Sequence, residues 1–249
     1  MIVNPDHIPR GVLLLGDYGS GKTEVAVNLA LSLAMAPGSG KVTIADLDLV
    51  NPYFRCREAL APMEAAGVEV LMPRDGHAFA DLPILLPGVK GLLQRTHRGP
   101  EGWAILDVGG DEVGSRVLSA LGPVIDPARH GVWFVVNMNR PFCDTAAGCL
   151  KVIQGVERAS RMTVTGLVSN THLMDETTAE MVEQGAALSR ELARLHGAPL
   201  QLVAAMEAHC EALDTEALGA PLLPMQRIMV PPWLRRPGGL TGPEVFRGA

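Results

Sequence analysis

The sequence contains few cysteines, and their arrangement predicts neither a disulfide framework nor a zinc site. The four cysteines are Cys56, Cys143, Cys149 and Cys210, and no two of them form a CxxC pair. No run of histidines and cysteines has the spacing of a zinc site. The simplest interpretation is a set of scattered reduced thiols in a cytosolic protein. The alternative is a metal or iron–sulfur site shared between subunits, with Cys143 and Cys149 as ligands.

Long apolar runs are also missing. No apolar stretch reaches the roughly 18 residues that a membrane-spanning helix needs. The N-terminal stretch MIVNPDHIPR has no apolar segment behind a basic start, so we do not interpret it as a signal peptide. Aromatic residues make up only 4% of a chain that is 47% hydrophobic, which predicts a mostly aliphatic core. We therefore expect a soluble, cytoplasmic protein.

Positive charge is in the minority. The chain has 21 Lys and Arg residues against 27 Asp and Glu residues, which gives a net charge of −6. A mildly acidic chain is a poor candidate for a dedicated nucleic-acid binder, which argues against DNA as a partner. The C-terminal stretch PPWLRRPGGLTG contains too many Pro and Gly residues for a basic amphipathic helix, which argues against a membrane partner.

What the chain does contain is a series of short apolar runs. They are residues 11–16, 41–48, 68–72, 103–110, 131–137, 163–170, 200–206 and 227–230. The runs are continuous rather than alternating, which is typical of strands buried on both faces of a parallel sheet. Segments with helical spacing lie between them. The pattern predicts the α/β fold class, with a doubly wound, mostly parallel sheet of about seven or eight strands and helices on both faces.

The helical segments are less sharply bounded than the strands. We predict helices over residues 22–36, 144–160 and 176–196, and a short helix near 83–95. Thr177 or Thr178 is suited to cap the start of the third helix, and Gly197 its end. Because we find neither an internal repeat nor a long linker, we expect one domain over residues 1–249, with an irregular tail over residues 231–249.

Polar or turn-forming residues follow most of the predicted strands. They are Gly16, Asp46, Asp48, Asp107, Gly110, Asn137, Asn139, Asn170 and Glu207. In a parallel sheet these carboxyl ends meet at one edge, and open α/β sheets bind their ligands there.

Residues 16–23, GDYGSGKT, match the phosphate-binding loop pattern between a buried strand and a helix. The glycines allow successive backbone N–H groups to turn toward phosphate oxygens, and the start of the helix adds a partial positive charge. The Lys22 ammonium would reach the β- and γ-phosphates, and the Thr23 hydroxyl would ligate Mg²⁺. The predicted cofactor-binding residues here are Gly16, Gly19, Ser20, Gly21, Lys22, Thr23 and Glu24. The alternative is a glycine-rich turn without a ligand.

Two acidic motifs extend this prediction. Asp107 begins the motif DVGGD after an apolar strand, where a carboxylate can hold a Mg²⁺-bound water and the Gly110 N–H can contact the γ-phosphate. Alternatively, Asp107 is a helix cap followed by turn glycines. Asp46 and Asp48 are two residues apart at a strand end, so their carboxylates share one face. That arrangement suits Mg²⁺ and an attacking water, with solvated strand-end acids as the alternative.

The motifs GDYGSGKT, ADLDLVNP, LDVGGD and LVSN together resemble those of the ParA/MinD/CobQ-type ATPases, in order and in spacing. This branch of the P-loop proteins also contains the nitrogenase iron protein. The resemblance implies that Lys22 and Thr23 bind phosphate and Mg²⁺, that Asp46 and Asp107 support the metal and that Asp48 orients the attacking water. It further implies that Asp111 assists water activation, that Asn170 hydrogen-bonds adenine and that Pro231 belongs to a loop over the base.

The chain departs from this branch at one position. Members with a deviant loop carry a second lysine after the first glycine, which reaches the phosphates of a partner subunit, whereas this chain has Asp17 there. An acid beside a polyphosphate is repelled, so we expect Asp17 to cap a turn or to face a partner. Arg55, Arg57 and Arg140 are candidates for the missing charge, or else form ordinary salt bridges.

These observations predict a Mg²⁺-dependent protein that binds ATP or ADP and acts as a slow ATPase and switch for a protein partner, with a homodimer as one arrangement. The predicted catalytic residues are Lys22, Asp48 and Asp111, and the predicted metal ligands are Thr23, Asp46 and Asp107. The stretch SNTH lacks the Asn-Lys-x-Asp series that binds guanine, which favours adenine. One alternative is a regulatory module with negligible turnover. Another is an ATP-dependent ligase similar to CobQ or dethiobiotin synthetase, with its substrate near His77, His97 and Arg140.

Overall fold

The protein is described by a computed structural model that covers residues 3–38, 40–48, 59–72, 78–98, 102–109 and 112–229. Its strands are β1 (Gly11–Gly16), β2 (Val42–Leu47), β3 (Glu69–Leu71), β4 (Trp103–Val108), β5 (His130–Val136), β6 (Gly166–Ser169), β7 (Leu200–Met206) and β8 (Leu222–Met225). Its α-helices are α1 (Lys22–Met35), α2 (Leu60–Ala65), α3 (Ala78–Arg98), α4 (Glu112–Leu121), α5 (Ala146–Ser160), α6 (Ala179–His196) and α7 (Glu207–Cys210).

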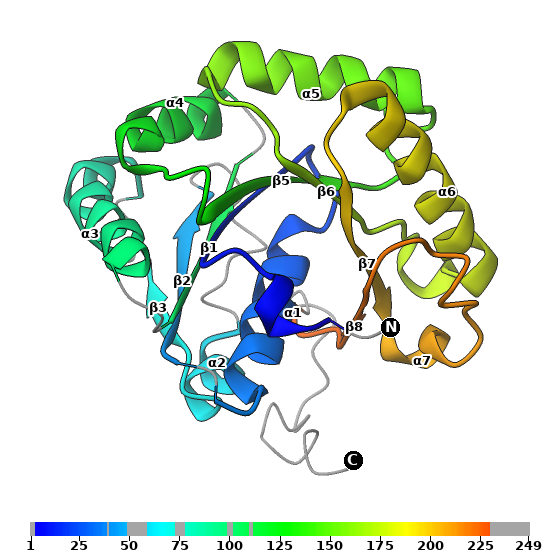
Figure 1. Ribbon diagram of the computed structural model, residues 1–249, viewed down its shortest axis with the longest axis horizontal. Helices are drawn as coiled ribbons and strands as arrows, with labels where there is room; N and C mark the ends of the chain where they lie inside the picture. Colours follow the sequence, from blue (N-terminus) through cyan, green and yellow to red (C-terminus); the bar gives the residue numbers. More distant parts are fainter. Residues whose placement is uncertain are drawn as a thin grey trace.

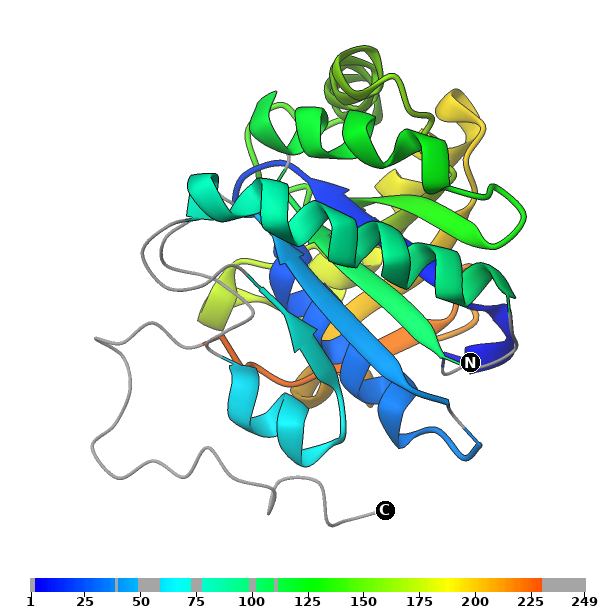
Figure 2. The ribbon, with the colours of Figure 1, turned by 90° about the vertical axis from the view of Figure 1, so that its left-hand side faces the viewer.

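The eight strands form one sheet in the order β3-β2-β4-β1-β5-β6-β7-β8, and every neighbouring pair is parallel. Helices α3, α4, α5 and α6 cover one face, while α1 and α2 lie on the other (Figure 1). Figure 2 looks onto the β3 edge and shows α3 lying along the sheet. The predicted α/β class, parallel sheet and strand number are therefore confirmed. Strands β2, β3 and β4 lie on one side of β1, and the later strands β5 to β8 lie on the other side. The direction of winding therefore reverses at β1, which is the switch point of the sheet.

The continuous apolar runs are explained by two cores, one on each face of the sheet. Leu14 and Ile105 point to the core that contains α1, whereas Leu13 and Leu106 point to the opposite core. Successive residues of a strand alternate between faces, so a strand that is covered on both sides must be apolar at every position. Phe134 and Trp133 are fully buried neighbours that fill opposite cores.

The helix predicted near 83–95 is present but longer than expected, and the predicted last strand was misplaced. The predicted short helix at 83–95 is the full helix α3, Ala78–Arg98, which continues through Pro83 and Pro87. The burial of Val89, Leu92 and Leu93 in the core outweighs the low helix propensity of that stretch.

The predicted last strand was also misplaced. No strand forms over 227–229, and β8 instead covers Leu222–Met225, including Pro224. Proline lacks an N–H donor and is tolerated at an edge, and β8 pairs on one side only, with β7. The backbone N–H groups of Ile228 and Met229 bond to a side chain of α1 instead of to a strand.

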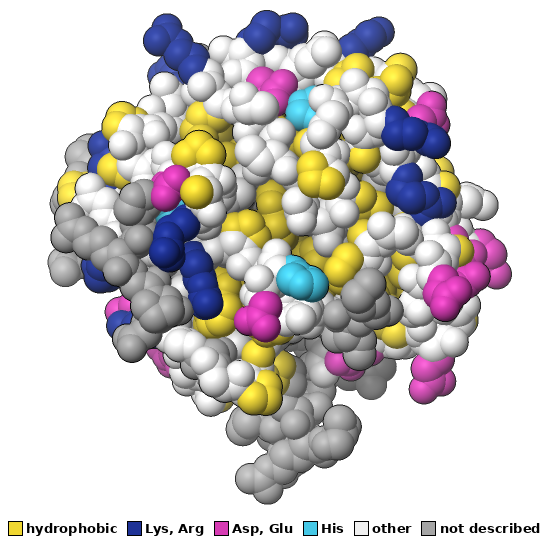
Figure 3. Space-filling view, in the orientation of Figure 1, with side chains coloured by type: hydrophobic (Ala, Val, Ile, Leu, Met, Phe, Trp, Pro, Cys, Tyr) yellow, Lys and Arg dark blue, Asp and Glu magenta, His cyan; other side chains and the backbone are white. Residues whose placement is uncertain are grey.

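On the face shown in Figure 3, several Lys and Arg side chains lie along the upper rim, and Asp and Glu side chains gather at the lower right. Among the described helices, none combines the length and the apolarity that crossing a bilayer requires.

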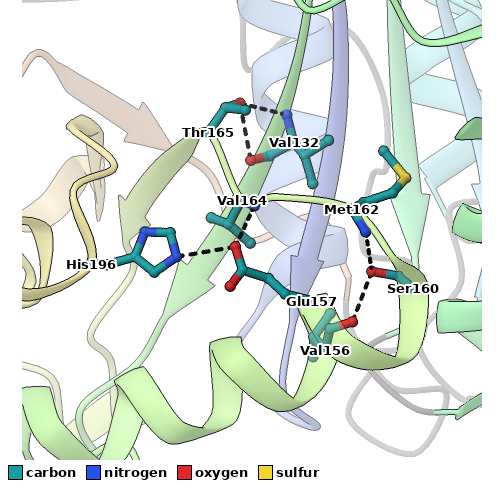
Figure 4. Close-up of polar contacts among 8 residues, drawn as sticks. All are labelled: Val132, Val156, Glu157, Ser160, Met162, Val164, Thr165 and His196. Carbon is teal, nitrogen blue, oxygen red and sulfur yellow. Dashed lines mark hydrogen bonds and ion pairs between the residues drawn. The ribbon is translucent and has the colours of Figure 1, made fainter.

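A small polar cluster joins helices α5 and α6 to the residues just before β6 (Figure 4). Glu157 near the end of α5 accepts a hydrogen bond from Val164 N at 2.8 Å and contacts His196 Nε2, at the end of α6, at 3.1 Å. Thr165 Oγ1 accepts from Val132 N at 2.9 Å. The predicted caps of α6 are also confirmed, since Thr178 is its N-cap and Gly197 its left-handed C-cap.

Candidate functional site

The loop predicted to bind phosphate leaves β1 at Gly16 and enters α1 at Lys22. Ser20 N donates to Asp17 O at 3.0 Å and closes a turn, and Tyr18 N donates to Asp17 Oδ1 at 2.7 Å. Asp17 thus has the turn-capping arrangement that we expected of it. The Ser20 hydroxyl is buried and has no hydrogen-bond partner among the described residues.

Glycine is required at two positions of this loop. Gly19 and Gly21 have φ angles of 72° and 83°, in the left-handed region that side chains disfavour. A Cβ at Gly19 would lie 2.8 Å from Cζ of Arg140, and a Cβ at Gly21 would lie 2.3 Å from Nδ2 of Asn170. The glycines therefore serve both the turn and the close packing of the loop against the edge of the sheet.

The acids that end β2 and β4 lie at the start of α1. Lys22 Nζ forms an ion pair with Asp48 Oδ2 at 2.8 Å, with both side chains under 10% exposed. Asp46 Oδ1 accepts from Asp48 N at 3.2 Å. Thr23 Oγ1 donates to Asp107 Oδ2 at 2.6 Å. Asp46 and Asp107 are register partners on neighbouring strands.

Strand alternation explains why these acids all face α1. Ile44 and Ile105 lie in the core on the α1 side, so Asp46 and Asp107, two residues further along, point to the same side. Hydroxyl and carboxylate oxygens are the ligands that Mg²⁺ prefers, so Thr23, Asp46 and Asp107 fit a magnesium site chemically. The structure thus brings together Lys22, Thr23 and the three acids that sequence analysis selected.

On the side of the loop away from these acids lie an amide side chain, Asn170, and a basic side chain, Arg140. Asn170 Nδ2 donates to Ser20 O at 2.8 Å, and Arg140 Nε donates to Gly19 O at 2.7 Å. The Asn170 amide, expected to bind adenine, thus supports the phosphate loop, and Arg140, considered as a phosphate ligand, clamps it.

Sequence reasoning did not select His172, which also lies on this side of the loop. Its Nε2 lies 3.1 Å from where a Cβ of Gly21 would be, and its N donates to Asn137 Oδ1 at 3.3 Å. Burial, together with the nearby charges of Arg140 and Arg227, lowers the pKa of His172 from 6.5 to about 4. His172 is therefore neutral near pH 7. The stretch SNTH at the end of a strand was the available signal, but only the fold brings it against the loop.

Glu24 was expected among the nucleotide-binding residues, but its carboxylate contacts another part of the chain. Oε1 accepts from Ile228 N at 2.6 Å and Oε2 accepts from Met229 N at 3.1 Å. Desolvation raises the pKa of Glu24 and the two N–H donors lower it, and the net result is a rise from 4.5 to about 7. No local pattern in the sequence indicated this contact, because its partners are about 200 residues away.

Several predicted site residues lie outside the described residues, namely Gly110, Asp111, Pro231, Arg55, Arg57 and His77. The irregular tail predicted over 231–249 also lies there. Cys143, Cys149 and Cys210 are free thiols, and Cys149 Sγ lies 3.5 Å from Cys143 O. Within the described part of the chain, no group of three or more His, Cys, Asp or Glu residues is arranged to hold a metal ion.

No protein-family model matches this sequence, and no curated protein sequence is significantly similar to it. Solved structures are similar in fold. FtsY from Mycoplasma mycoides aligns with a TM-score of 0.52 at 15% identity, over 82% of this chain and 62% of its own. The signal recognition particle receptor FtsY from Elizabethkingia anophelis, in complex with GDP, aligns with a TM-score of 0.54 at 18% identity, over 79% of this chain and 57% of its own.

A third structure, FtsY from Thermotoga maritima, aligns with a TM-score of 0.52 at 17% identity, over 92% of this chain and 69% of its own. This chain thus spans less than two thirds of the length of the first two structures. At such identities the likeness establishes the fold alone. The assignment to the ParA/MinD/CobQ branch stays a prediction. The chain has the α/β fold of the P-loop NTPases.

Proposed function

We propose that this protein binds a nucleoside triphosphate with Mg²⁺ and hydrolyses it slowly. It would act as a switch, because a partner protein would distinguish its conformation before hydrolysis from that after hydrolysis. The observation that carries the proposal is the position of Lys22 and Thr23 at the start of α1, in contact with Asp48 and Asp107. A phosphate loop, a lysine, a hydroxyl and strand-end acids are the parts that phosphoryl transfer requires.

The roles follow from the contacts. The loop amides and Lys22 would bind the phosphates, and Lys22 would exchange its contact with Asp48 for one with phosphate oxygen. Thr23, Asp46 and Asp107 would hold Mg²⁺, which neutralises charge on the phosphates when bound. Asp48, released from Lys22, would then orient the attacking water. The roles inferred for Asp111, Gly110 and Pro231 remain part of this proposal.

We propose ATP, with ADP as product, as the nucleotide. The absence of an Asn-Lys-x-Asp series favours adenine. The neighbour from Elizabethkingia anophelis binds GDP, so guanine nucleotides belong in the same test. The ligase alternative has less support, because Arg140 is engaged by Gly19 O. A binding module without turnover is the second candidate, favoured by Asp17 in place of the second lysine.

We place the protein in the cytoplasm as a single domain, and we propose a protein partner or a second copy at the nucleotide face. Two large side chains support a protein contact there. Tyr18, within the phosphate loop, is 74% exposed, and Phe142, which follows the clamp residue Arg140, is 73% exposed. The net charge of −6 gives no support to DNA as a partner.

The test is binding and turnover of Mg·ATP and Mg·GTP by wild-type protein and by Lys22→Ala. Loss of the lysine should weaken triphosphate binding by about 100-fold or abolish turnover. Lys41→Ala is the matched control, because the Lys41 side chain is 68% exposed and pairs with Glu69 on the surface. Calorimetry measures binding and phosphate release measures turnover. Equal affinity and turnover in wild type and Lys22→Ala would contradict the proposal.

A further inference from the structure

The chain after β8 is fastened to the helix that begins at the phosphate loop. In the sheet, β8 lies four strands away from β1, at the edge. Residues 226–229 nevertheless contact α1, because that helix also packs against β8 (Figure 1). We call residues 226–229 the C-terminal segment.

Two side chains of α1 hold this segment. Glu24 accepts backbone hydrogen bonds from Ile228 and Met229, at 2.6 Å and 3.1 Å. One turn further, Asn28 Nδ2 donates to Gln226 O at 3.0 Å, and Asn28 Oδ1 accepts from Gln226 N at 2.9 Å. Residues four apart lie on one helix face, so Glu24 and Asn28 form a continuous row of side-chain contacts.

The arrangement is a built contact rather than an incidental one. The Glu24 carboxyl is desolvated, and charge-assisted bonds to backbone N–H groups are stronger than neutral ones. The side chain of Asn28 is 7% exposed, and both its amide nitrogen and its amide oxygen hydrogen-bond to the backbone of Gln226. Met229 is 3% exposed and lies in the same core as Val25 and Leu29 of α1. The segment is therefore seated against the helix by polar and apolar contacts together.

The outer side of the segment is tied to the carboxyl ends of other strands. Arg227 forms an ion pair with Asp175, shortly after β6, at 2.8 Å, and Gln226 Nε2 donates to Glu207 Oε2, just after β7, at 3.1 Å. The charge of Arg227 also acts on His172, which lies against Gly21. The C-terminal segment thus lies against the first turn of α1, which begins directly after the phosphate loop.

The charge distribution around the loop indicates which end of a nucleotide would face this segment. Asp46, Asp48 and Asp107 lie on the β2 and β4 side of β1 and suit the metal and the terminal phosphate. The nucleoside must then leave the loop on the opposite side, because phosphates and base are at opposite ends of the ligand. Asn170, His172 and the C-terminal segment lie on that side.

We propose that Glu24, supported by Asn28, is a positioning residue that holds the C-terminal segment as the wall for the nucleoside end of a bound nucleotide. The inference rests on the proposed function and deepens it. Glu24 directly follows Lys22 and Thr23 in α1, yet its carboxylate oxygens accept hydrogen bonds from Ile228 and Met229 of the C-terminal segment. Its effect is therefore on the base and ribose and not on the phosphates.

The test compares Mg·ATP with Mg·tripolyphosphate, which has the phosphates but no nucleoside. Calorimetry near pH 8 on wild type and Glu24→Gln should give a loss of about tenfold in ATP affinity and a change of no more than about twofold for tripolyphosphate. Glu180→Gln is the matched control, because Glu180 also lies in the first turn of a helix but is exposed. If Glu24→Gln does not fold, Asn28→Ala removes the other half of the contact. It should likewise weaken ATP binding by about tenfold and leave tripolyphosphate binding within about twofold of wild type.

Unchanged ATP affinity in the variant, or equal losses for ATP and tripolyphosphate, would overturn the positioning role. Equal losses would mean that Glu24 supports the phosphate loop itself. Failure of the wild-type protein to bind either ligand would be a different result, since it would overturn the proposed nucleotide function.

Discussion

Lys22 and Asp48 form a buried ion pair, with Nζ and Oδ2 2.8 Å apart, between the start of α1 and the end of β2. A buried pair of this kind is costly to break on one side only, because the remaining charge is left in a low-dielectric site. A bound phosphate would provide Lys22 with a second anion. The pair therefore connects the phosphate loop to the residue that we propose for orienting water.

Asp48→Asn should retain nucleotide binding and lose hydrolysis. The neutral amide competes less with phosphate for Lys22, so we expect ATP affinity to be equal or higher, and turnover to fall by about 100-fold through loss of a general base. Phosphate release and calorimetry check the two parts. Asp144→Asn is the control, because Asp144 is exposed. Turnover that survived Asp48→Asn at the wild-type rate would remove Asp48 from this role.

Asp107→Asn should raise the magnesium requirement. Asp107 Oδ2 accepts the Thr23 hydroxyl proton at 2.6 Å, which directs the lone pairs of the hydroxyl oxygen away from Asp107. Loss of a carboxylate next to a metal ligand weakens metal binding by about 10- to 100-fold. The measurement is nucleotide affinity at increasing Mg²⁺ concentration. Thr23→Ser keeps the hydroxyl and should behave as wild type, and a wild-type magnesium curve for Asp107→Asn would contradict the assignment.

Glu24 should make stability decrease as the pH rises from about 4.5 to 7. Burial raises the pKa of Glu24 from 4.5 to about 7. In this window the unfolded chain has released the Glu24 proton while the folded chain retains it. Raising the pH therefore favours unfolding, by up to about 1.4 kcal/mol per pH unit, and the effect ends above pH 7.

The measurement is urea denaturation of wild type and Glu24→Gln between about pH 5 and pH 8. The difference between the two proteins is the relevant quantity, because His172, whose pKa is lowered to about 4, acts in the opposite direction. His172 favours folding as the pH rises from about 4 to 6.5. The difference in the free energy of unfolding should change by about 2–3 kcal/mol over the range, and a constant difference would show that Glu24 does not titrate there.

Gly185→Ala should destabilise the protein through a contact behind the site. A Cβ at Gly185 in α6 would lie 2.0 Å from Thr171 Oγ1, which follows β6. Relieving this overlap requires α6 to move, at a cost of about 1–3 kcal/mol in the free energy of unfolding. Gly155→Ala in α5 is the control, since nothing lies within 4 Å of its Cβ position, and it should stabilise by up to about 1 kcal/mol. Urea denaturation measures both, and equal stabilities would contradict the close packing.

The sequence predicted the site best where function depends on neighbours in the chain. The spacing of Gly16, Gly21, Lys22 and Thr23 indicated the phosphate loop, because the loop is one turn between one strand and one helix. Asp46 and Asp107 were predicted to lie together because strand alternation and parallel strand direction place strand-end acids at one edge, and the structure pairs them in register. The caps Thr178 and Gly197 were predicted for the same reason, since a cap acts within one turn of its helix.

The sequence was misleading where long-range packing outweighs local preference. Pro83 and Pro87 do not stop α3, because Leu92 and Leu93 are buried under the sheet. Pro224 does not exclude β8, because an edge strand leaves one side unpaired. The contacts of Arg140 with Gly19 and of Asn170 with Ser20 join residues more than 100 positions apart, so no local pattern specified them.

By itself the sequence determined the two-sided apolar strands, the parallel α/β architecture and the phosphate loop, because these depend on periodicity and on the conformational freedom of glycine over a few residues. Only the tertiary structure decided that Asp48 faces Lys22, that Arg140 and Asn170 hold the loop and that Glu24 turns to the chain after β8. The physical reason is that burial and hydrogen bonding between distant segments depend on how helices cross the sheet, which local propensity does not encode.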